Sequence, residues 1–256
     1  MKDIEKLDKE YVLHTYARNY VNFKKGVNAT LYDDENKDYI DFTSGIGVTS
    51  VGHGNARVAK RIFEQVSNLT HTSNLYAIEP QALLAKKIKE LSGYDVRTFF
   101  FFFFYEANEG AIKIARTNGE LNFEKKKYKI ITLENSFHGR TITTVKATGQ
   151  SSFHQSKFAP YPDGFSFNAI DDVYNAIDDE TVAVMIELVQ GEGGVFPFDK
   201  EKIKELAKFL KENDILLIID EVQTGVFRTG EFLASNLYDI EPDIITLAKG
   251  IGGGVP

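Results

Sequence analysis

The stretch that decides the fold is Ile215-Leu216-Leu217-Ile218-Ile219-Asp220-Glu221, in which a short apolar run ends in two acidic residues. A second, mostly apolar run at residues 243–248 ends at Lys249 and continues into a glycine-rich segment. Short apolar runs that alternate with helical patterns are typical of buried strands in a parallel sheet. Ligands of open α/β sheets bind at the carboxyl ends of the strands, so Asp220 and Lys249 are candidates for one site.

The rest of the chain continues this alternation of strands and helices. Further strands are predicted at residues 96–104, 128–133 and 181–188, and helices at residues 56–69, 79–91, 106–116 and 200–211. An alternating segment at residues 27–41 predicts a hairpin that turns at residues 33–36. We therefore predict an α/β fold with a mostly parallel sheet and flanking helices. An N-terminal arm with the hairpin is expected at residues 1–45, and one large domain at residues 46–256.

Composition narrows the functional class. The formal net charge of −7 argues against a nucleic-acid partner, and the absence of cysteine excludes disulfides and thiolate chemistry. The five histidines are too far apart for a local metal-ligand pattern, and His138 alone is expected near a site. The start of the chain has no apolar signal core, and no run approaches the ~20 apolar residues of a membrane span. We expect a cytoplasmic protein without a membrane partner.

An acid and an amine at neighbouring strand ends suit pyridoxal phosphate. This cofactor needs a lysine amine for its covalent attachment and an acid that keeps its pyridinium nitrogen protonated. Lys249 and Asp220 fit these two roles. From the residues alone, Lys249 as a solvated lysine and Asp220 as a helix cap are alternatives. The Walker B strand of an ATPase is a third, but the chain has no phosphate loop of the form G-x-x-x-x-G-K-[ST].

Polar and aromatic residues near other strand ends extend the candidate site. Phe137 can stack on a cofactor ring, and Arg140 can hold a carboxylate in a bidentate fork. Glu187 lies inside an apolar run, where an unpaired carboxylate is costly, which favours a functional or network role. Glu192 lies in a glycine-rich loop, and Gln223 follows shortly after the acidic pair. Ordinary core, surface and capping roles are the alternatives for these side chains.

Four ordered motifs then give a resemblance to a known family. They are Ser-Phe-His-Gly-Arg-Thr at 136–141, Val-Gln-Gly-Glu-Gly-Gly at 189–194, Asp-Glu-Val-Gln-Thr-Gly at 220–225 and Leu-Ala-Lys-Gly at 247–250. Together they resemble class III aminotransferases. Residues 41–48 and 71–76 resemble the acetylornithine aminotransferase branch of that family in particular.

The resemblance implies a fold, a reaction and a set of roles. The fold is the large domain of a fold type I pyridoxal-phosphate-dependent transferase, and the reaction moves an amino group from N-acetylornithine to 2-oxoglutarate in arginine biosynthesis. Lys249 matches the catalytic, cofactor-linked lysine. The matching cofactor-binding residues are Phe104, Tyr105, Phe137, Glu187, Asp220, Val222 and Gln223. Arg140 matches the arginine that binds the substrate carboxylate, and Glu192 a glutamate that switches the pocket between donor and acceptor.

The chain departs from the family pattern at the expected phosphate site. Family members carry an Asn-Ser-Gly-Ala type turn at a helix start, where this chain has Phe102-Phe103-Phe104-Tyr105 at the end of a run of six phenylalanines. The substitution removes a glycine, and bulky rings are expected to occupy the phosphate's place. A catalytically silent fragment is therefore one alternative function. A sister enzyme acting on 4-aminobutyrate, ornithine or succinylornithine is another.

The resemblance also implies that a longer protein exists. Family members continue beyond the lysine with the rest of the sheet and a small C-terminal domain. The 256 residues are therefore expected to be the N-terminal two-thirds of an enzyme, with the C-terminal domain absent. The full-length protein is expected to be a homodimer.

Overall fold

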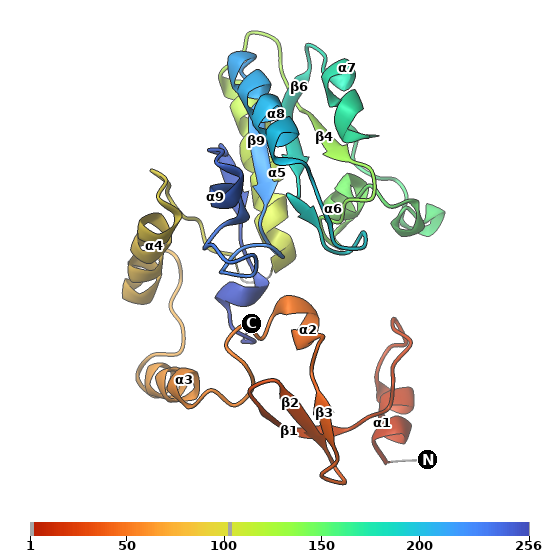
Figure 1. The fold of residues 1–256 in the computed structure, drawn as a ribbon, viewed down its shortest axis with the longest axis vertical. Coiled ribbons are helices and arrows are strands. Elements are labelled where there is room, and N and C mark those ends of the chain that lie inside the picture. Colours follow the sequence, from red (N-terminus) through yellow and green to blue (C-terminus); the bar gives the residue numbers. More distant parts are fainter. Residues whose placement is uncertain (1–2, 102–103, 256) are drawn as a thin grey trace. The chain divides into compact units, whose positions relative to one another are not determined.

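The computed structural model describes residues 3–101 and 104–255, which form two compact units (Figure 1). The first unit extends to Ser73, and the second begins at Asn74. The domain boundary that the sequence predicts between residues 45 and 46 stays a prediction.

The first unit is built around a small antiparallel sheet. Its elements are α1 (Asp3–Tyr11), β1 (Phe23–Val27), β2 (Thr30–Asp33), β3 (Asp38–Ile40), α2 (Ser44–Gly47) and α3 (Ala56–Asn68). The strands lie in the order β1-β2-β3, and the predicted hairpin is confirmed as the antiparallel pair β2–β3. Asp33 Oδ1 fixes its turn by accepting the backbone N–H groups of Glu35 and Lys37, each at 2.9 Å.

The short element α2 is a left-handed turn. Ser44, Gly45 and Ile46 have φ angles of 49°, 61° and 63°. Each non-glycine residue in this conformation costs about 1–2 kcal/mol, so the turn needs support from its surroundings. Asp41 supplies it, because its Oδ1 accepts the backbone N–H of Ser44 at 2.8 Å and its Oδ2 lies 2.7 Å from Nε2 of His53.

The second unit is an α/β domain, as predicted. Its strands β4 (Lys129–Leu133), β5 (Phe165–Asn168), β6 (Thr181–Ile186), β9 (Leu216–Asp220) and β10 (Ile244–Thr246) form a parallel sheet in the order β10-β9-β6-β4-β5. Its helices are α4 (Glu79–Ser92), α5 (Phe104–Leu121), α6 (Ile142–Ala147), α7 (Val173–Ala176), α8 (Lys200–Glu212) and α9 (Ala234–Tyr238). A small antiparallel ribbon joins β7 (Val189–Gln190) to β8 (Phe196–Pro197).

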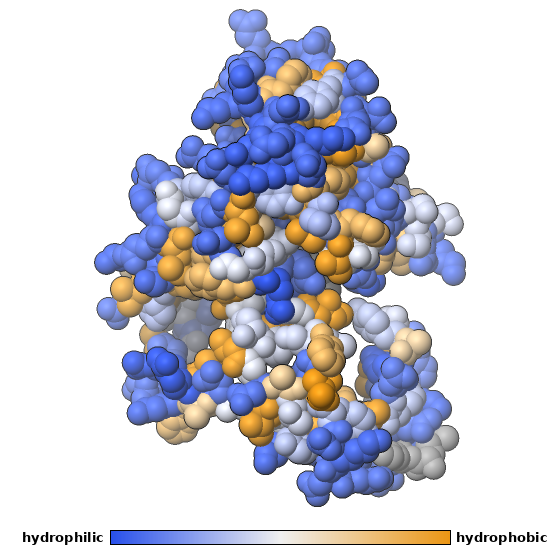
Figure 2. Space-filling view, viewed as in Figure 1, coloured by the Kyte–Doolittle hydropathy of each residue, from blue (hydrophilic) through white to orange (hydrophobic). Residues whose placement is uncertain are grey.

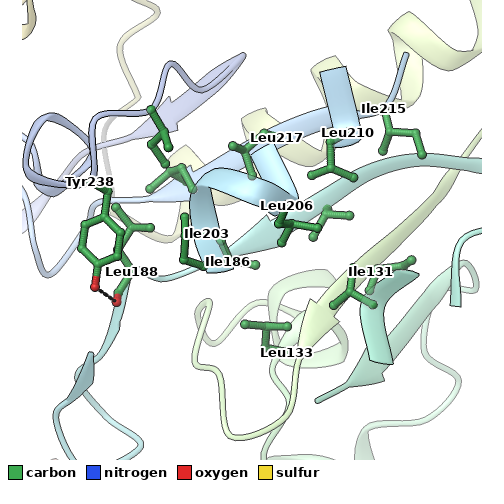
Figure 3. Close-up of a cluster of buried hydrophobic side chains, with 14 of the residues drawn as sticks. Ile131, Leu133, Ile186, Leu188, Ile203, Leu206, Leu210, Ile215, Leu217 and Tyr238 are labelled. Carbon is green, nitrogen blue, oxygen red and sulfur yellow. Dashed lines mark hydrogen bonds between the residues drawn. The ribbon is translucent and has the colours of Figure 1, made fainter. Parts of the chain in front are cut away.

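Two hydrophobic cores cover the two faces of this sheet. On one face α8 packs Ile203, Leu206 and Leu210 against strand residues such as Ile131 and Ile186 (Figure 3). On the other face α5 contributes Ala111, Ile112 and Ala115, which pack against Ile130, Met185 and Ile218. Neighbouring residues of β4 and β9, such as Ile130 and Ile131, thus point to opposite cores. Each large aliphatic side chain buried this way contributes about 1.5–3 kcal/mol.

The outward faces of the covering helices are polar. Figure 2 shows a hydrophilic surface over α8, whose lysines and glutamates face away from the core. None of the helices among the described residues is both long and apolar enough to cross a membrane.

One predicted strand is wrong. Residues 96–101 form no strand, and Phe104 begins helix α5, while Phe102 and Phe103 lie outside the described residues. A strand needs a neighbour for its backbone hydrogen bonds, and none of the described strands pairs with this segment, so the aromatic propensity is overridden. Strand β5 was not predicted, because its four residues are too short for a clear period.

Candidate active site

A pocket opens at the carboxyl ends of the central strands. It is lined by Asn108, Phe137, His138, Gly139, Glu187, Glu192, Asp220, Val222, Gln223 and Lys249. Seven of the ten residues predicted for the site are among them, drawn from segments up to 112 residues apart. Their chemical roles stay predictions, but the structure brings them together.

Asp220 is the most completely bonded side chain of the pocket. It ends β9 and is 4% exposed. Its Oδ2 accepts the Nδ2 amide of Asn108 at 2.8 Å and lies 2.9 Å from Nδ1 of His138. Its Oδ1 accepts the backbone N–H of Val222 at 3.0 Å and the hydroxyl of Thr246 at 3.4 Å. Four hydrogen-bond partners hold this carboxylate in one orientation.

His138 is buried beside that carboxylate. Burial lowers the pKa of the imidazole, but the hydrogen bond and charge of Asp220 and the charge of Glu187 outweigh burial and raise the pKa above 6.5. The backbone N–H of His138 donates to Oγ1 of Thr148 at 3.0 Å, which fixes the loop before α6. Its second ring nitrogen, Nε2, has no hydrogen-bond partner among the described residues.

Glu187 is a second buried carboxylate in the pocket, immediately after β6. Burial raises its pKa to about 7, and the negative charge of Asp220 adds to the rise, while the charge of His138 opposes it. Its Oε2 accepts the backbone N–H of Phe137 at 2.9 Å. A backbone hydrogen bond from Gly191 also reaches it. These two bonds tie two pocket loops together, which agrees with a network role for Glu187, one of the two roles the sequence favoured, while its functional role stays a prediction.

Lys249 projects into the pocket from a 3₁₀ turn that follows β10. Its φ of 48° is left-handed, an uncommon conformation for a residue other than glycine. Its Nζ donates to Oε1 of Gln223. Burial lowers the pKa of its amine, although the charge of Asp220 partly opposes this effect. At a given pH, a larger fraction of this amine is therefore neutral than it would be without burial.

Phe137 lines the pocket, whereas Arg140 does not. The Phe137 ring lines the pocket and meets the Phe153 ring at a centroid distance of 5.3 Å. Arg140 is exposed and does not line the pocket, and its guanidinium lies 5.6 Å from the Phe137 ring centroid and 5.0 Å from that of Phe153. Its substrate-binding role stays a prediction.

Glu221, and not Asp220, accepts the backbone N–H groups at the start of a helix. Glu221 is fully buried and accepts the backbone N–H groups of Ala234 at 3.0 Å and Ser235 at 2.7 Å, which belong to the first turn of α9. The hydroxyls of Thr224 and Ser235 donate to it as well. Asp220 therefore faces the pocket, whereas Glu221 holds the start of α9 in place.

The expected phosphate end lies at the start of α5. Phe104 and Tyr105 are the first two residues of this helix, so its N-terminal turn contains no glycine. Phe101 packs against the helix one turn further on, since a Cβ placed on Gly110 would lie 2.3 Å from Cζ of Phe101. The backbone N–H groups of a helix start favour an anion whichever side chains surround them.

Sequence reasoning assigned no role to three residues that line the pocket, His138, which it only expected near a site, and Asn108 and Gly139. Asn108 lies on α5, inside the segment Glu-Ala-Asn-Glu-Gly, and nothing local to that segment indicates a partner 112 residues away. Gly139 has a φ of 140°, and a Cβ there would lie 2.5 Å from Oγ1 of Thr144, so no larger side chain fits. Its place in the motif at residues 136–141 was the available signal.

The residues of the pocket fit the ring of pyridoxal phosphate. A buried carboxylate, an amine with a lowered pKa and an aromatic face line one pocket, which is the donor set that this ring requires. Oδ1 of Asn108 and Nε2 of His138 are buried there without a hydrogen-bond partner among the described residues, so both atoms are free to form a further hydrogen bond. The described residues contain no group of three or more His, Asp or Glu side chains suited to a metal ion.

Comparison with known proteins identifies the family. The sequence profile of aminotransferase class III matches residues 12–256. The chain belongs to the class III aminotransferases. This family uses pyridoxal phosphate, which agrees with the donor set of the pocket.

Two similar curated relatives carry the same name. The chain is 62% identical over 254 residues to an acetylornithine aminotransferase of Wolinella succinogenes, covering 98% of this chain and 64% of that relative. It is 47% identical to an acetylornithine aminotransferase of Aquifex aeolicus, covering 96% of this chain and 66% of that protein. The chain therefore spans about two-thirds of the length of the curated relatives it matches.

Solved structures agree with the fold. An ornithine aminotransferase from Toxoplasma gondii superposes with a TM-score of 0.92 at 31% identity, over 99% of this chain and 61% of that one. An N-acetylornithine aminotransferase from Stenotrophomonas maltophilia gives a TM-score of 0.81 at 31% identity, over 98% of this chain and 62% of that one. The chain therefore shares this fold and spans about three-fifths of the length of these two structures.

Proposed function

We propose that the chain is the cofactor-binding part of an aminotransferase that moves an amino group from N-acetylornithine to 2-oxoglutarate. The observation that carries the proposal is the pairing of Asp220, held by four hydrogen-bond partners, with Lys249 in one pocket. The identity of 62% to a relative named acetylornithine aminotransferase supports the choice of donor. A place in arginine biosynthesis follows from that donor.

When bound, pyridoxal phosphate supplies an electron sink for the carbon that bears the amino group. Lys249 would hold the cofactor, and its Nζ, with a lowered pKa, would accept and return the proton of that carbon. The carboxylate of Asp220 would keep the ring nitrogen protonated, because an adjacent negative charge favours the protonated base. Phe137 would cover a ring face, and Val222, Gln223 and Glu187 would complete the cofactor's surroundings.

The substrate carboxylate would be bound by Arg140, whose guanidinium lies against the pocket-lining ring of Phe137. Glu192 is exposed and lines the pocket, where its charge would disfavour a dicarboxylate unless a cation pairs with it. This pair of opposite charges would orient the amino donor with its amine towards Lys249. Rate measurements on Arg140→Lys test the first role, because a lysine keeps the charge and loses the bidentate fork, so KM should rise more than kcat falls.

Absorbance titration with pyridoxal phosphate tests the cofactor site directly. The chain should develop a visible band that is absent from Lys249→Ala, because only a covalent link to the lysine shifts the cofactor's absorbance. Lys208→Ala on exposed α8 is the matched control and should keep the band. A band of equal strength in Lys249→Ala would remove this lysine from its role.

Substrate preference within the family is the second question. The match to an ornithine aminotransferase structure keeps ornithine as an alternative donor, alongside 4-aminobutyrate and succinylornithine. Steady-state kcat/KM values for each donor, measured on an intact protein that contains this sequence, decide the matter. A higher value for any donor other than N-acetylornithine would overturn the assignment.

The start of α5 motivates the alternative of a catalytically silent chain. Phe104 and Tyr105 open that helix where the family pattern has a glycine turn. The block Phe102→Asn, Phe103→Ser, Phe104→Gly and Tyr105→Ala should tighten binding of pyridoxal phosphate at least about tenfold, since each 1.4 kcal/mol of recovered phosphate contact is tenfold. Unchanged affinity would show that the aromatic side chains do not block the cofactor. The homodimer and the cytoplasmic location stay part of the proposal for the intact protein.

A further inference from the structure

We propose that Asn108 is a positioning residue that fixes the orientation and the charge of the Asp220 carboxylate. Toward the cofactor this inference rests on the proposed function, because Asp220 is the residue that would face the ring nitrogen. Toward the protein it stands alone, because Asn108, Asp220 and His138 are all described and all buried.

The geometry singles out one amide group. Nδ2 of Asn108 donates to Oδ2 of Asp220 at 2.8 Å and to the backbone oxygen of His138 at 2.7 Å. An amide nitrogen carries two hydrogens, so both are used. The same Oδ2 also meets Nδ1 of His138 at 2.9 Å. Asn108 therefore holds the two members of the His138–Asp220 pair in register, one through its carboxylate and one through its backbone.

The position of Asn108 along its helix gives the bond a further consequence. Asn108 lies four residues after Phe104, about one turn from the start of α5. That helix start is the expected phosphate end of the pocket, while Asp220 ends β9 at the ring-nitrogen end. Because Asn108 lies only one helical turn from the start of α5, its hydrogen bond to Asp220 fixes the distance between the helix start and the end of β9.

The buried amide oxygen argues against a purely scaffolding role. Oδ1 of Asn108 has no hydrogen-bond partner among the described residues, although the residue is 2% exposed. A residue chosen only for packing would not leave such an atom unpaired, because an unmet buried acceptor is destabilising. The amide is retained at that cost for the two bonds its nitrogen makes.

The charged groups around His138 and Asp220 determine how the His138 pKa responds to a substitution. Asp220 and Glu187 both raise the pKa of His138, and Lys249 lies in the same pocket. Loss of the Asn108 donor leaves the Asp220 carboxylate less neutralised, so its hold on the His138 proton strengthens. His138 therefore reports on the charge of Asp220 without any cofactor.

The experiment is an NMR titration of the five histidines in the 256-residue chain, with and without Asn108→Ala. We expect the pKa of His138 to rise by at least about half a unit in the variant, while His14 and His71 do not move. Asn118→Ala on the same helix, about 15 Å further along, is the matched control and should leave His138 unchanged. A His138 pKa that is the same in Asn108→Ala and in the unmodified chain overturns the proposal.

Two further variants keep the test decisive. If Asn108→Ala does not fold, Asn108→Ser removes the same two bonds and retains a small polar side chain. Thr246→Val removes the longer bond onto Asp220, at 3.4 Å, and should shift the His138 pKa in the same direction by less. A larger shift for Thr246→Val than for the Asn108 variants contradicts the assignment of the main role to Asn108.

Titration with pyridoxal phosphate separates this inference from the proposed function. If the unmodified chain binds the cofactor, Asn108→Ala should weaken binding at least about fivefold, and unchanged affinity overturns the role toward the cofactor. If the unmodified chain does not bind it, the proposed function fails while the His138 titration still decides whether Asn108 governs Asp220.

Discussion

His138 Nδ1 and Asp220 Oδ2 lie 2.9 Å apart, although 82 residues separate them and both side chains are almost fully buried. A buried imidazole on its own would favour its neutral form, and the carboxylate reverses that preference. The pair is therefore an electrostatic unit, and either member reports on the other.

Asp220→Asn tests this unit from the carboxylate side. The substitution keeps the shape and removes the charge, so the burial of His138 is no longer outweighed and its pKa should fall by about one unit or more. Histidine NMR titration measures the fall. Asp178→Asn, which removes an exposed carboxylate paired with Lys129, should leave His138 where it is. A rise of the His138 pKa in Asp220→Asn would contradict the arrangement.

Glu221→Gln should destabilise the fold through α9. The carboxylate accepts four hydrogen bonds from Thr224, Ala234 and Ser235 with no exposure to water. A glutamine presents a donor to at least one of these donors, so we expect a loss of about 2–3 kcal/mol in the free energy of unfolding. Urea unfolding measures it. The exposed Glu231→Gln is the control and should change the free energy by less than about 0.5 kcal/mol.

Glu187→Gln should change how stability depends on pH. The folded pKa of Glu187, about 7, lies above its ordinary value of 4.5. Its contribution to stability is therefore fully present below pH 4.5 and is lost as the pH rises through 7. His138, whose pKa is also raised, acts in the same direction.

Glutamine mimics the protonated acid and removes this loss. Between pH 5 and 8 the unmodified chain should lose about 1–3 kcal/mol more than the variant, measured by thermal unfolding at each pH. The exposed Glu134→Gln should follow the unmodified chain across the same range. Parallel curves for the Glu187 variant and the unmodified chain would contradict the raised pKa.

Gly119→Ala sets helix propensity against packing. Alanine gains about 1 kcal/mol in a helix, so on propensity alone α5 should become more stable. A Cβ at this position, however, would lie 1.9 Å from the backbone oxygen of Lys127 and 2.9 Å from Cγ2 of Val182 on β6. Neither the loop backbone nor the buried strand can move away cheaply, so we expect a net loss of about 1–2 kcal/mol in urea unfolding. Thr117→Ala, exposed on the same helix, should be neutral or slightly stabilising, and a stable Gly119→Ala would show that the loop yields.

The sequence predicted the sheet edge correctly for a reason that the structure makes plain. Strands β9 and β10 are parallel neighbours, with Thr246 paired to Asp220, so residues that follow them meet at the same edge. This rule brought Asp220 and Lys249 together in advance. It depends only on which run is a strand and where the run ends.

The parts that failed depend on contacts between distant segments. The phenylalanine run has strong strand propensity, yet Phe104 begins a helix, because pairing partners and not propensity decide a strand. Asn108 is on a helix, outside the strand-end rule, and its bond to Asp220 spans 112 residues. Arg140, assigned from the motif, lies outside the pocket lining against two aromatic rings, a placement that no local pattern specifies, and its role stays a prediction.

Lys249 should lose its proton at a lower pH than Lys204. Burial lowers the pKa of the Lys249 amine, whereas the half-buried Lys204 has its pKa raised by the hydrogen bond to Asp239. Reductive methylation with NMR detection follows each amine as the pH rises, and the midpoint of each curve, unlike its rate, is independent of access. The Lys249 midpoint should precede that of Lys204 by about one unit or more.

A second variant fixes the cause of that early midpoint. The charge of Asp220 raises the Lys249 pKa against burial, so Asp220→Asn should move the Lys249 midpoint to a still lower pH and leave Lys204 in place. In Asp220→Asn the charge that opposes burial is gone, so at a given pH a smaller fraction of Lys249 is protonated than in the unmodified chain. A midpoint for Lys249 at or above that of Lys204 in the unmodified chain would rule out a buried amine at this strand end.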